Sequence, residues 1–210
     1  EEPVPHSDIP GEQSSPTQPI PNRPAAFERQ GLSEDDLIDF TPTLREMAKT
    51  IVNDYSYGPL YMAQTVASMD KKGTIIVPGI IGGASWAGAA VDPTKGVIYI
   101  PSYTFPTFLT ITEAEDPDAH FRYTGGVTFG PDGPRGLPLL KPPYGRITAI
   151  DLNTGAHAWQ VPVGDGPRDH PSLAHLDLPS LGWAQRNFPI ITESLLFAAT
   201  QAQWDVVNNS

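Results

Sequence analysis

The chain has 210 residues, a formal net charge of -11 at pH 7 and no cysteine. An acidic surface repels phosphate backbones, which makes nucleic acid an improbable partner. The lack of cysteine excludes a disulfide framework and a thiolate metal site. With 19 glycines and 24 prolines, the composition favours turns and loops over long helices.

The first 32 residues are rich in proline. Proline removes backbone donors and favours extended conformations, so no regular element is expected here. The segment is either a flexible tail or an extended strap across the domain. Ile9, Ile20 and Phe27 are the residues that would hold such a strap.

Residues 33–54 form the one clearly helical region. Ser33 can cap a short helix, and Thr41 followed by Pro42 resembles an N-cap with proline at the first helical position. Apolar residues then recur at helical spacing and predict a face that packs onto a sheet. They are Leu44, Met47, Ala48 and Ile51.

Residues 73–102 read as strands, beginning with Gly73–Val77 and followed by a hairpin over 90–100. The run from 73 to 91 carries no charge, but its glycines and Pro78 argue against a membrane helix. Residues 103–143 are expected to form a long ordered loop on the ligand side, because several aromatic residues stand among its glycines and prolines.

A second hairpin is predicted over Tyr144–Gly164, with its turn at Asp151–Gly155 and Trp159 on the returning strand. Two strands alone are marginal in water, so the hairpin should belong to a larger array. The positions Ala90, Asp92 and Gly96 repeat the spacing of Ala149, Asp151 and Gly155, with Ile100 at the tryptophan position. Two copies of one unit favour a radial array of blades.

After a connecting loop at 164–171, the segments 188–192 and 195–200 read as further strands. The final residues, 201–210, are polar and show no completing hairpin, so the last blade is expected to be unfinished.

The most distinctive candidate site is Gly82-Gly83-Ala84-Ser85-Trp86. Glycines beside a tryptophan let a backbone approach a flat ligand closely, but an indole can equally fill a core between blades. His170, His175 and Asp177 could suggest a metal site, although their spacing suits no helix or strand face and a solvated loop is the simpler interpretation. The sequence contains neither a serine elbow nor a glycine-rich nucleotide loop before a helix.

The spacing A-x-D-x-x-T-G-x-x-x-W over 149–159 resembles the tryptophan docking motif of quinoprotein β-propellers. Further segments, in the same order, resemble the membrane-bound glucose dehydrogenases that depend on pyrroloquinoline quinone (PQQ). These segments are Val4–Glu12, Ser15–Pro19, Asp35–Pro42, Gly82–Trp86, Ala90–Pro93, Tyr144–Trp159 and Gly164–Pro171.

The resemblance implies an all-β fold, part of an eight-bladed propeller, with a short helical segment near 33–54 and long loops. At about 40–50 residues per blade, the chain holds four blades at most. It would divide into a proline-rich extended strap at 1–32 and part of the propeller domain at 33–210, with the remaining blades on the rest of the protein or on another chain. In the family, the indole of the docking motif wedges between neighbouring blades.

The resemblance also implies a PQQ cofactor, contacted here by Trp86, Ser85 and Gly83. The family often has asparagine where this chain has Ser85, which puts that hydrogen bond in doubt. The family's catalytic aspartate, its quinone-contacting lysine and its ligands for calcium or magnesium lie upstream of the matched part. No catalytic or metal-binding residue is therefore assigned to this chain, which is expected to be inactive alone.

The expected whole is a periplasmic enzyme, associated with the inner membrane through a region not present here. It would oxidise glucose or a related sugar or polyol and pass electrons to ubiquinone. The alternative is a non-catalytic β-propeller scaffold for protein assembly, which would need neither the Gly82–Trp86 segment nor the insert at 103–143.

Overall fold

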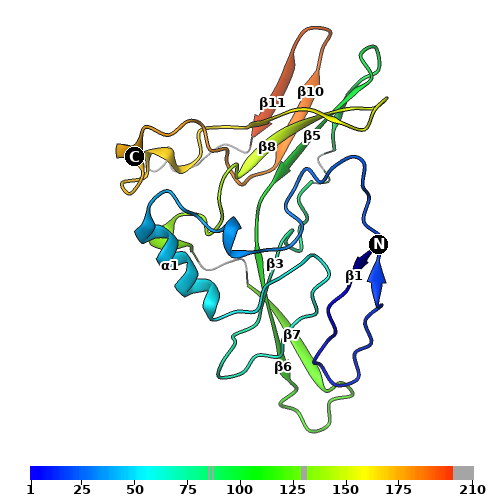
Figure 1. Cartoon of the computed structure of the whole chain (residues 1–210), viewed down its shortest axis with the longest axis vertical. Coiled ribbons are helices and arrows are strands. Elements are labelled where there is room, and N and C mark those ends of the chain that lie inside the picture. The colour runs from blue at the N-terminus through cyan, green and yellow to red at the C-terminus, as the bar shows by residue number, and fades with distance from the viewer. Residues whose placement is uncertain (85, 87, 129–131, 201–210) are drawn as a thin grey trace. The chain divides into compact units, whose positions relative to one another are not determined.

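A computed structural model of the chain describes residues 1–84, 86, 88–128 and 132–200. The chain divides into two units, which are described separately. The first contains residues 1–22, 28–83 and 104–142, and the second contains 23–27, 84–103 and the part from 143 onward. Strands outnumber helices in the described residues (Figure 1), in agreement with the all-β prediction, and no sheet in the described part closes on itself.

The second unit is built on an antiparallel sheet of four strands in the order β4-β5-β8-β9. The strands are β4 (Ala90–Asp92), β5 (Val97–Tyr103), β8 (Gly145–Asp151) and β9 (His157–Pro162). Both predicted hairpins are therefore confirmed, and they lie in one sheet, with β5 paired to β8. A four-stranded antiparallel sheet is the repeating unit of a propeller.

The two hairpins turn in the same way, which confirms the internal repeat. Asp151 Oδ1 accepts hydrogen bonds from the backbone N–H groups of Asn153 (2.7 Å) and Thr154 (3.1 Å), and Asp92 Oδ1 accepts from Thr94 and Lys95 (both 3.0 Å). Each turn ends on a glycine with positive φ, at 65° for Gly96 and 68° for Gly155. A side chain is strained in that conformation, so both turns need glycine.

The register differs from the sequence spacing at the tryptophan position. Trp159 stands opposite Ala149, whereas Tyr99, and not Ile100, stands opposite Ala90. The difference arises because the β8–β9 pairing passes from His157 to Trp159 and leaves Ala158 as an extra residue, which is a β-bulge.

Ala90, Tyr99 and Ala149 lie in one cross-strand row, and these residues with Ile147 form a buried apolar cluster. The indole of Trp159 lies 5.6 Å from the Tyr99 ring, centroid to centroid, and is 40% exposed. Partly buried Ile191 and Leu196 pack against the cluster.

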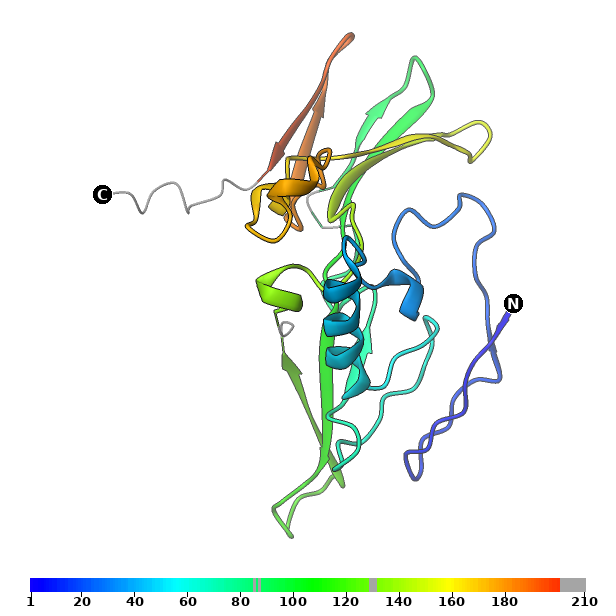
Figure 2. The ribbon, with the colours of Figure 1, turned by 60° about the vertical axis from the view of Figure 1, so that its left-hand side comes forward.

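The segments around Glu193 and Ser194 form the predicted strands β10 (Asn187–Ile191) and β11 (Leu196–Thr200). Figures 1 and 2 show this hairpin beside the β4–β5 hairpin, with which β10 is in contact. Its outward residues stay exposed, among them Ile190 at 66% and Phe197 at 54%. The connecting loop before it contains two short 3₁₀ helices, η3 (Pro167–Asp169) and η4 (Ala174–Leu176).

The first unit contains the predicted helical region. Ser33 and Asp36 form a capping box around the 3₁₀ helix η1 (Glu34–Asp36), and Thr41 caps helix α1 (Pro42–Asn53) through a 3.2 Å bond from Leu44 N–H to its hydroxyl. The buried face of α1 consists of Leu44, Ala48 and Val52, whereas Met47 and Ile51 are only half-buried. In the described residues, no helix combines the length and the apolar character needed to cross a membrane.

The prediction of a long loop at 103–143 is wrong. Residues in it form strands β6 (Thr107–Glu113) and β7 (Tyr123–Thr128), and β6 pairs with β3 (Thr74–Ile76) in a three-stranded antiparallel sheet. The physical reason is that β6 is rich in β-branched and apolar residues, with Phe108 and Leu109 buried against the unit's core. A short 3₁₀ helix, η2 (Pro134–Gly136), follows.

The expectation of no regular element near the N-terminus is also wrong in part. Two short strands, β1 (Glu2–Pro3) and β2 (Thr17–Gln18), pair antiparallel in the first unit. Residues 23–27 belong to the second unit, where His157 Nε2 donates to the carbonyl of Ala25 over 2.9 Å. Ile20, one of the expected anchors, is 38% exposed.

Candidate functional site

The Gly82–Trp86 segment crosses from one unit to the other after Gly83, so its two ends are described within their own units. Gly83 is buried in the first unit. A Cβ atom placed on it would lie 2.6 Å from Cγ of Glu28 and 2.8 Å from its Cβ. Distances this short are not tolerated, so the backbone at Gly83 lies against Glu28 because residue 83 has no side chain. Ser85 lies outside the described residues.

Trp86, in the second unit, presents most of its indole to the surroundings, with 79% of the residue exposed. The guanidinium carbon of Arg186 lies 5.4 Å from the centroid of its ring, within the range of a cation–π contact. The choice between a ligand face and a core position between blades, which the sequence left open, stays open for this indole. An exposed aromatic face beside a cation suits a flat, negatively charged ligand.

The second unit also contains buried polar side chains that lack a hydrogen-bond partner among the described residues. The side-chain amide of Asn187, one residue after Arg186, makes no hydrogen bond through its nitrogen or its oxygen, although the residue is only 5% exposed. Ser102 Oγ is likewise buried without a partner, and Ser102 pairs in an isolated bridge with Ala84. Buried polar groups are normally satisfied, so these atoms call for a partner that the described residues do not supply.

Within the first unit, a hydrogen-bond network surrounds Glu28. The Glu28 carboxylate accepts a hydrogen bond from the Thr104 hydroxyl over 2.9 Å and another from the backbone N–H of Arg29 over 2.8 Å. The Arg29 guanidinium donates to the Thr104 hydroxyl over 3.1 Å and to the Lys141 carbonyl over 2.8 Å. It also pairs with Asp36 over 3.3 Å.

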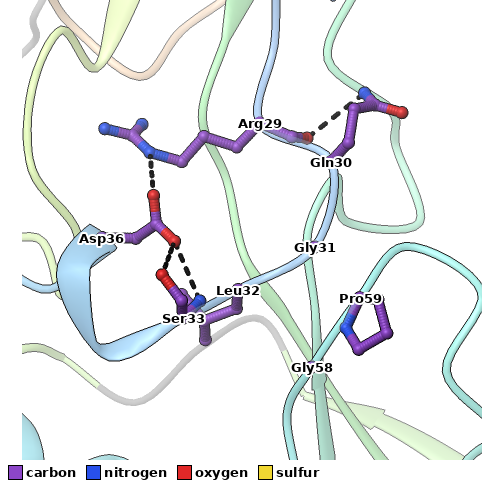
Figure 3. A pocket seen from close by; sticks show the side chains of 8 residues that line it. All are labelled: Arg29, Gln30, Gly31, Leu32, Ser33, Asp36, Gly58 and Pro59. Atoms are coloured by element: carbon purple, nitrogen blue, oxygen red, sulfur yellow. Dashed lines mark hydrogen bonds and ion pairs between the residues drawn. The ribbon is translucent and has the colours of Figure 1, made fainter.

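Arg29 and Asp36 also line an open pocket of about 430 Å³. Figure 3 shows the residues that line it. Arg29 points to Asp36, whose other oxygen accepts from both the backbone and the hydroxyl of Ser33 (2.8 and 2.7 Å). Since Asp36 and Arg29 are already bonded to protein groups, the pocket walls offer few free polar groups for a ligand. We therefore assign these contacts a structural role, because they join residues 29–33 to η1.

The resolved carboxylate pKa shifts belong to the two hairpin turns. The pKa of Asp151 is lowered mainly because Asn153 and Thr154 donate backbone hydrogen bonds to it. The pKa of Asp92 is lowered chiefly by the backbone N–H of Lys95, and the pKa of Lys95 is raised because its side-chain ammonium bonds to the Asp92 carboxylate over 3.1 Å. The hydrogen bonds that cause these shifts stabilise the turns, and the shifts do not indicate a catalytic acid or base.

Among the described residues, no group of three or more histidine and carboxylate side chains is arranged to hold a metal ion. His170, which the sequence suggested as a possible ligand, uses Nδ1 to accept from the backbone N–H of Ser172 over 3.1 Å.

The sequence analysis named Gly83, Ser85 and Trp86 as cofactor-binding candidates, which stays a prediction, and it did not point to Glu28 or Arg186. The contacts of Glu28 with residues 83 and 104, and of Arg186 with residue 86, join positions far apart in the chain. A short sequence motif carries no signal for such pairs.

The comparisons with known proteins show the family. Residues 1–207 match the family described as "PQQ: Glucose/ethanol/alcohol dehydrogenase, beta-propeller domain". Similar proteins include the quinate/shikimate dehydrogenase (quinone) of Acinetobacter baylyi, 30% identical over 96% of this chain and 27% of that protein. The glycerol dehydrogenase large subunit of Gluconobacter oxydans is 27% identical over 93% of this chain and 30% of that protein. The quinoprotein glucose dehydrogenase of Escherichia coli is 27% identical over 80% of this chain and 23% of that protein. The chain thus spans less than a third of the length of these relatives.

Proposed function

Since the chain belongs to the PQQ β-propeller domain family of glucose, ethanol and alcohol dehydrogenases, we propose that it is part of a PQQ-dependent dehydrogenase that oxidises a hydroxyl group of a sugar or polyol. The observation that carries this proposal is the family match over residues 1–207. The relatives are named for quinate or shikimate, glycerol and glucose, which are all polyhydroxy compounds. We further propose ubiquinone as the electron acceptor.

The residues around Trp86 suit such a cofactor. PQQ is a planar quinone with three carboxylate groups, and when bound it supplies the two-electron oxidant. Trp86 would offer its exposed indole to the flat ring, and Arg186 would offer a positive charge to a carboxylate. Gly83 would keep the backbone close to Glu28, and Ser85 would add a hydroxyl, shorter than the family's frequent asparagine.

The buried amide of Asn187 and the buried hydroxyl of Ser102 add hydrogen-bonding capacity in the second unit. These residues would bind and orient the cofactor, and none of them is proposed as the catalytic base. The base and the ligands of a calcium or magnesium ion would come from outside this segment.

The proposal also includes the place of this chain in the whole protein and the location of that protein in the cell. Residues 1–32 would act as a strap, residues 33–210 as part of the propeller, and the rest of the protein or another chain would supply the remaining blades. The enzyme would work in the periplasm, associated with the inner membrane through a region outside this segment. A non-catalytic scaffold remains the rival proposal, and the match to a dehydrogenase family favours the enzyme over it.

The test is reduction of an artificial dye by the whole protein, with PQQ and calcium or magnesium, on glucose, glycerol and quinate. We expect turnover of at least one substrate that depends on added PQQ, and no turnover by the 210-residue chain alone. Dye reduction that does not need PQQ would contradict the proposed cofactor. Robust turnover by the isolated chain would show that the catalytic groups lie within it.

A further inference from the structure

Glu28 is a charged residue type in an almost fully buried position, with 6% of its surface exposed. A buried carboxylate is costly unless hydrogen bonds compensate for the water it loses. The hydroxyl of Thr104, itself 4% exposed, and the backbone N–H of Arg29 provide two of them, at 2.9 and 2.8 Å. The side chain is thereby held in one orientation.

Arg29 makes this arrangement rigid. Its guanidinium donates to the same Thr104 hydroxyl over 3.1 Å, to the carbonyl of Lys141 over 2.8 Å and to Asp36 over 3.3 Å. The hydroxyl of Thr104 therefore lies between an arginine donor and the Glu28 carboxylate. Charge-assisted bonds of this kind fix geometry more strongly than neutral ones.

The fixed Glu28 side chain lies directly against Gly83. The nearest Glu28 atoms to a Cβ at position 83 are Cγ, at 2.6 Å, and Cβ, at 2.8 Å. These atoms belong to the root of the side chain and cannot swing away as its far end could. The φ angle of Gly83 lies outside the left-handed region, so this contact and not backbone strain is what demands glycine here.

We propose that Glu28 is a positioning residue for the cofactor segment: its side chain holds the backbone at Gly83, from which the chain runs to Trp86. The inference rests on the proposed function, because it gives the Gly82–Trp86 segment a role in binding PQQ. Glu28 does not touch the cofactor in this account. It acts through the backbone that it supports.

The experiment is a double-substitution cycle of Glu28→Gly, Gly83→Ala and their combination in the whole protein, measured by PQQ affinity from fluorescence titration and, separately, by the thermal midpoint. Gly83→Ala should weaken PQQ binding by about tenfold, the usual scale for losing the support behind a site. In the Glu28→Gly/Gly83→Ala double variant, residue 83 gains a Cβ and residue 28 loses the Cβ and Cγ atoms with which that Cβ would clash. This double variant should bind PQQ more tightly than Gly83→Ala alone.

Two controls separate positioning from general destabilisation. Glu28→Gln keeps the side-chain stem and an acceptor oxygen, so it should bind PQQ within about twofold of the wild type. Gly126→Ala lies in β7 with no atom within 4 Å of the added Cβ, and it should change neither affinity nor thermal midpoint.

The proposal is overturned if Gly83→Ala binds PQQ as tightly as the wild type, or if the double variant is no better than Gly83→Ala. Should the wild-type protein itself fail to bind PQQ, the proposed function fails and the positioning role with it. The thermal midpoints of the cycle would still report whether Glu28 and Gly83 are in contact, so the two failures are distinguishable.

Discussion

Ile147 offers a quantitative test of the packing in the second unit. It lies on the central strand β8, is 2% exposed and belongs to the buried cluster with Ala90, Tyr99 and Ala149. Replacing it with alanine removes three carbon atoms, worth about 2.4 kcal/mol of transfer free energy at about 0.8 kcal/mol each. The surrounding sheet relaxes only in part, so a cavity term raises the expected loss of unfolding free energy to about 3–4 kcal/mol.

Ile190 provides the matched control, because Ile190→Ala removes the same atoms from a strand of the same unit. Ile190 is 66% exposed, so most of its surface is already in contact with water. We expect Ile190→Ala to cost less than about 1 kcal/mol. The difference between the two losses of unfolding free energy then measures the effect of burial, because the side chain removed is the same in both variants.

Urea unfolding followed by tryptophan fluorescence is the suitable assay. Trp86, Trp159 and Trp183 all belong to the second unit, so the signal reports the unit that carries both substitutions. A two-unit chain need not unfold in one step, and a local probe avoids averaging over both units. Equal losses for Ile147→Ala and Ile190→Ala would refute the buried cluster.

Two further predictions concern caps and turns. Thr41→Ala should lower the free energy of unfolding by about 1 kcal/mol, because Leu44 N–H loses its acceptor, whereas Thr41→Ser should be nearly neutral; thermal denaturation decides between them. Asp92 and Asp151 have folded-state pKa values below their ordinary ones, so their stabilisation is complete above the unfolded pKa of about 4 and is lost as the pH falls through the folded pKa. Unfolding of the Asp92→Asn/Asp151→Asn double variant between pH 5 and pH 2 should therefore depend less on pH than that of the wild type, and an unchanged slope would contradict the turn geometry.

The sequence was most informative where local chemistry decides the structure. The Asp–Gly turns at 92–96 and 151–155 require an acceptor side chain and a positive φ, and those needs are visible in the residues themselves. The caps at Ser33 and Thr41 are local in the same way.

Pairing between distant segments was harder to predict. Strand β6 pairs with β3, which lies more than thirty residues earlier in the chain. In the sequence, the prolines and glycines around β6 favoured a loop instead. The bulge at Ala158 places Trp159 opposite Ala149, whereas the β4–β5 pairing has no such bulge and places Tyr99 opposite Ala90, so equal sequence spacing does not give equal register. Glu28 and Arg186 were missed because their role depends on residues that only the fold brings near.

The most direct test of the account is a titration of PQQ against the whole protein and its Trp86→Ala variant, with Trp159→Phe as the control. Trp86 offers an exposed indole, whereas Trp159 lies against Tyr99 in its own sheet. We predict saturable binding by the wild type and by Trp159→Phe, and affinity weaker by about tenfold for Trp86→Ala, which corresponds to about 1.4 kcal/mol. Equal affinity of Trp86→Ala and the wild type, or no saturable binding by any of the three, would contradict the account.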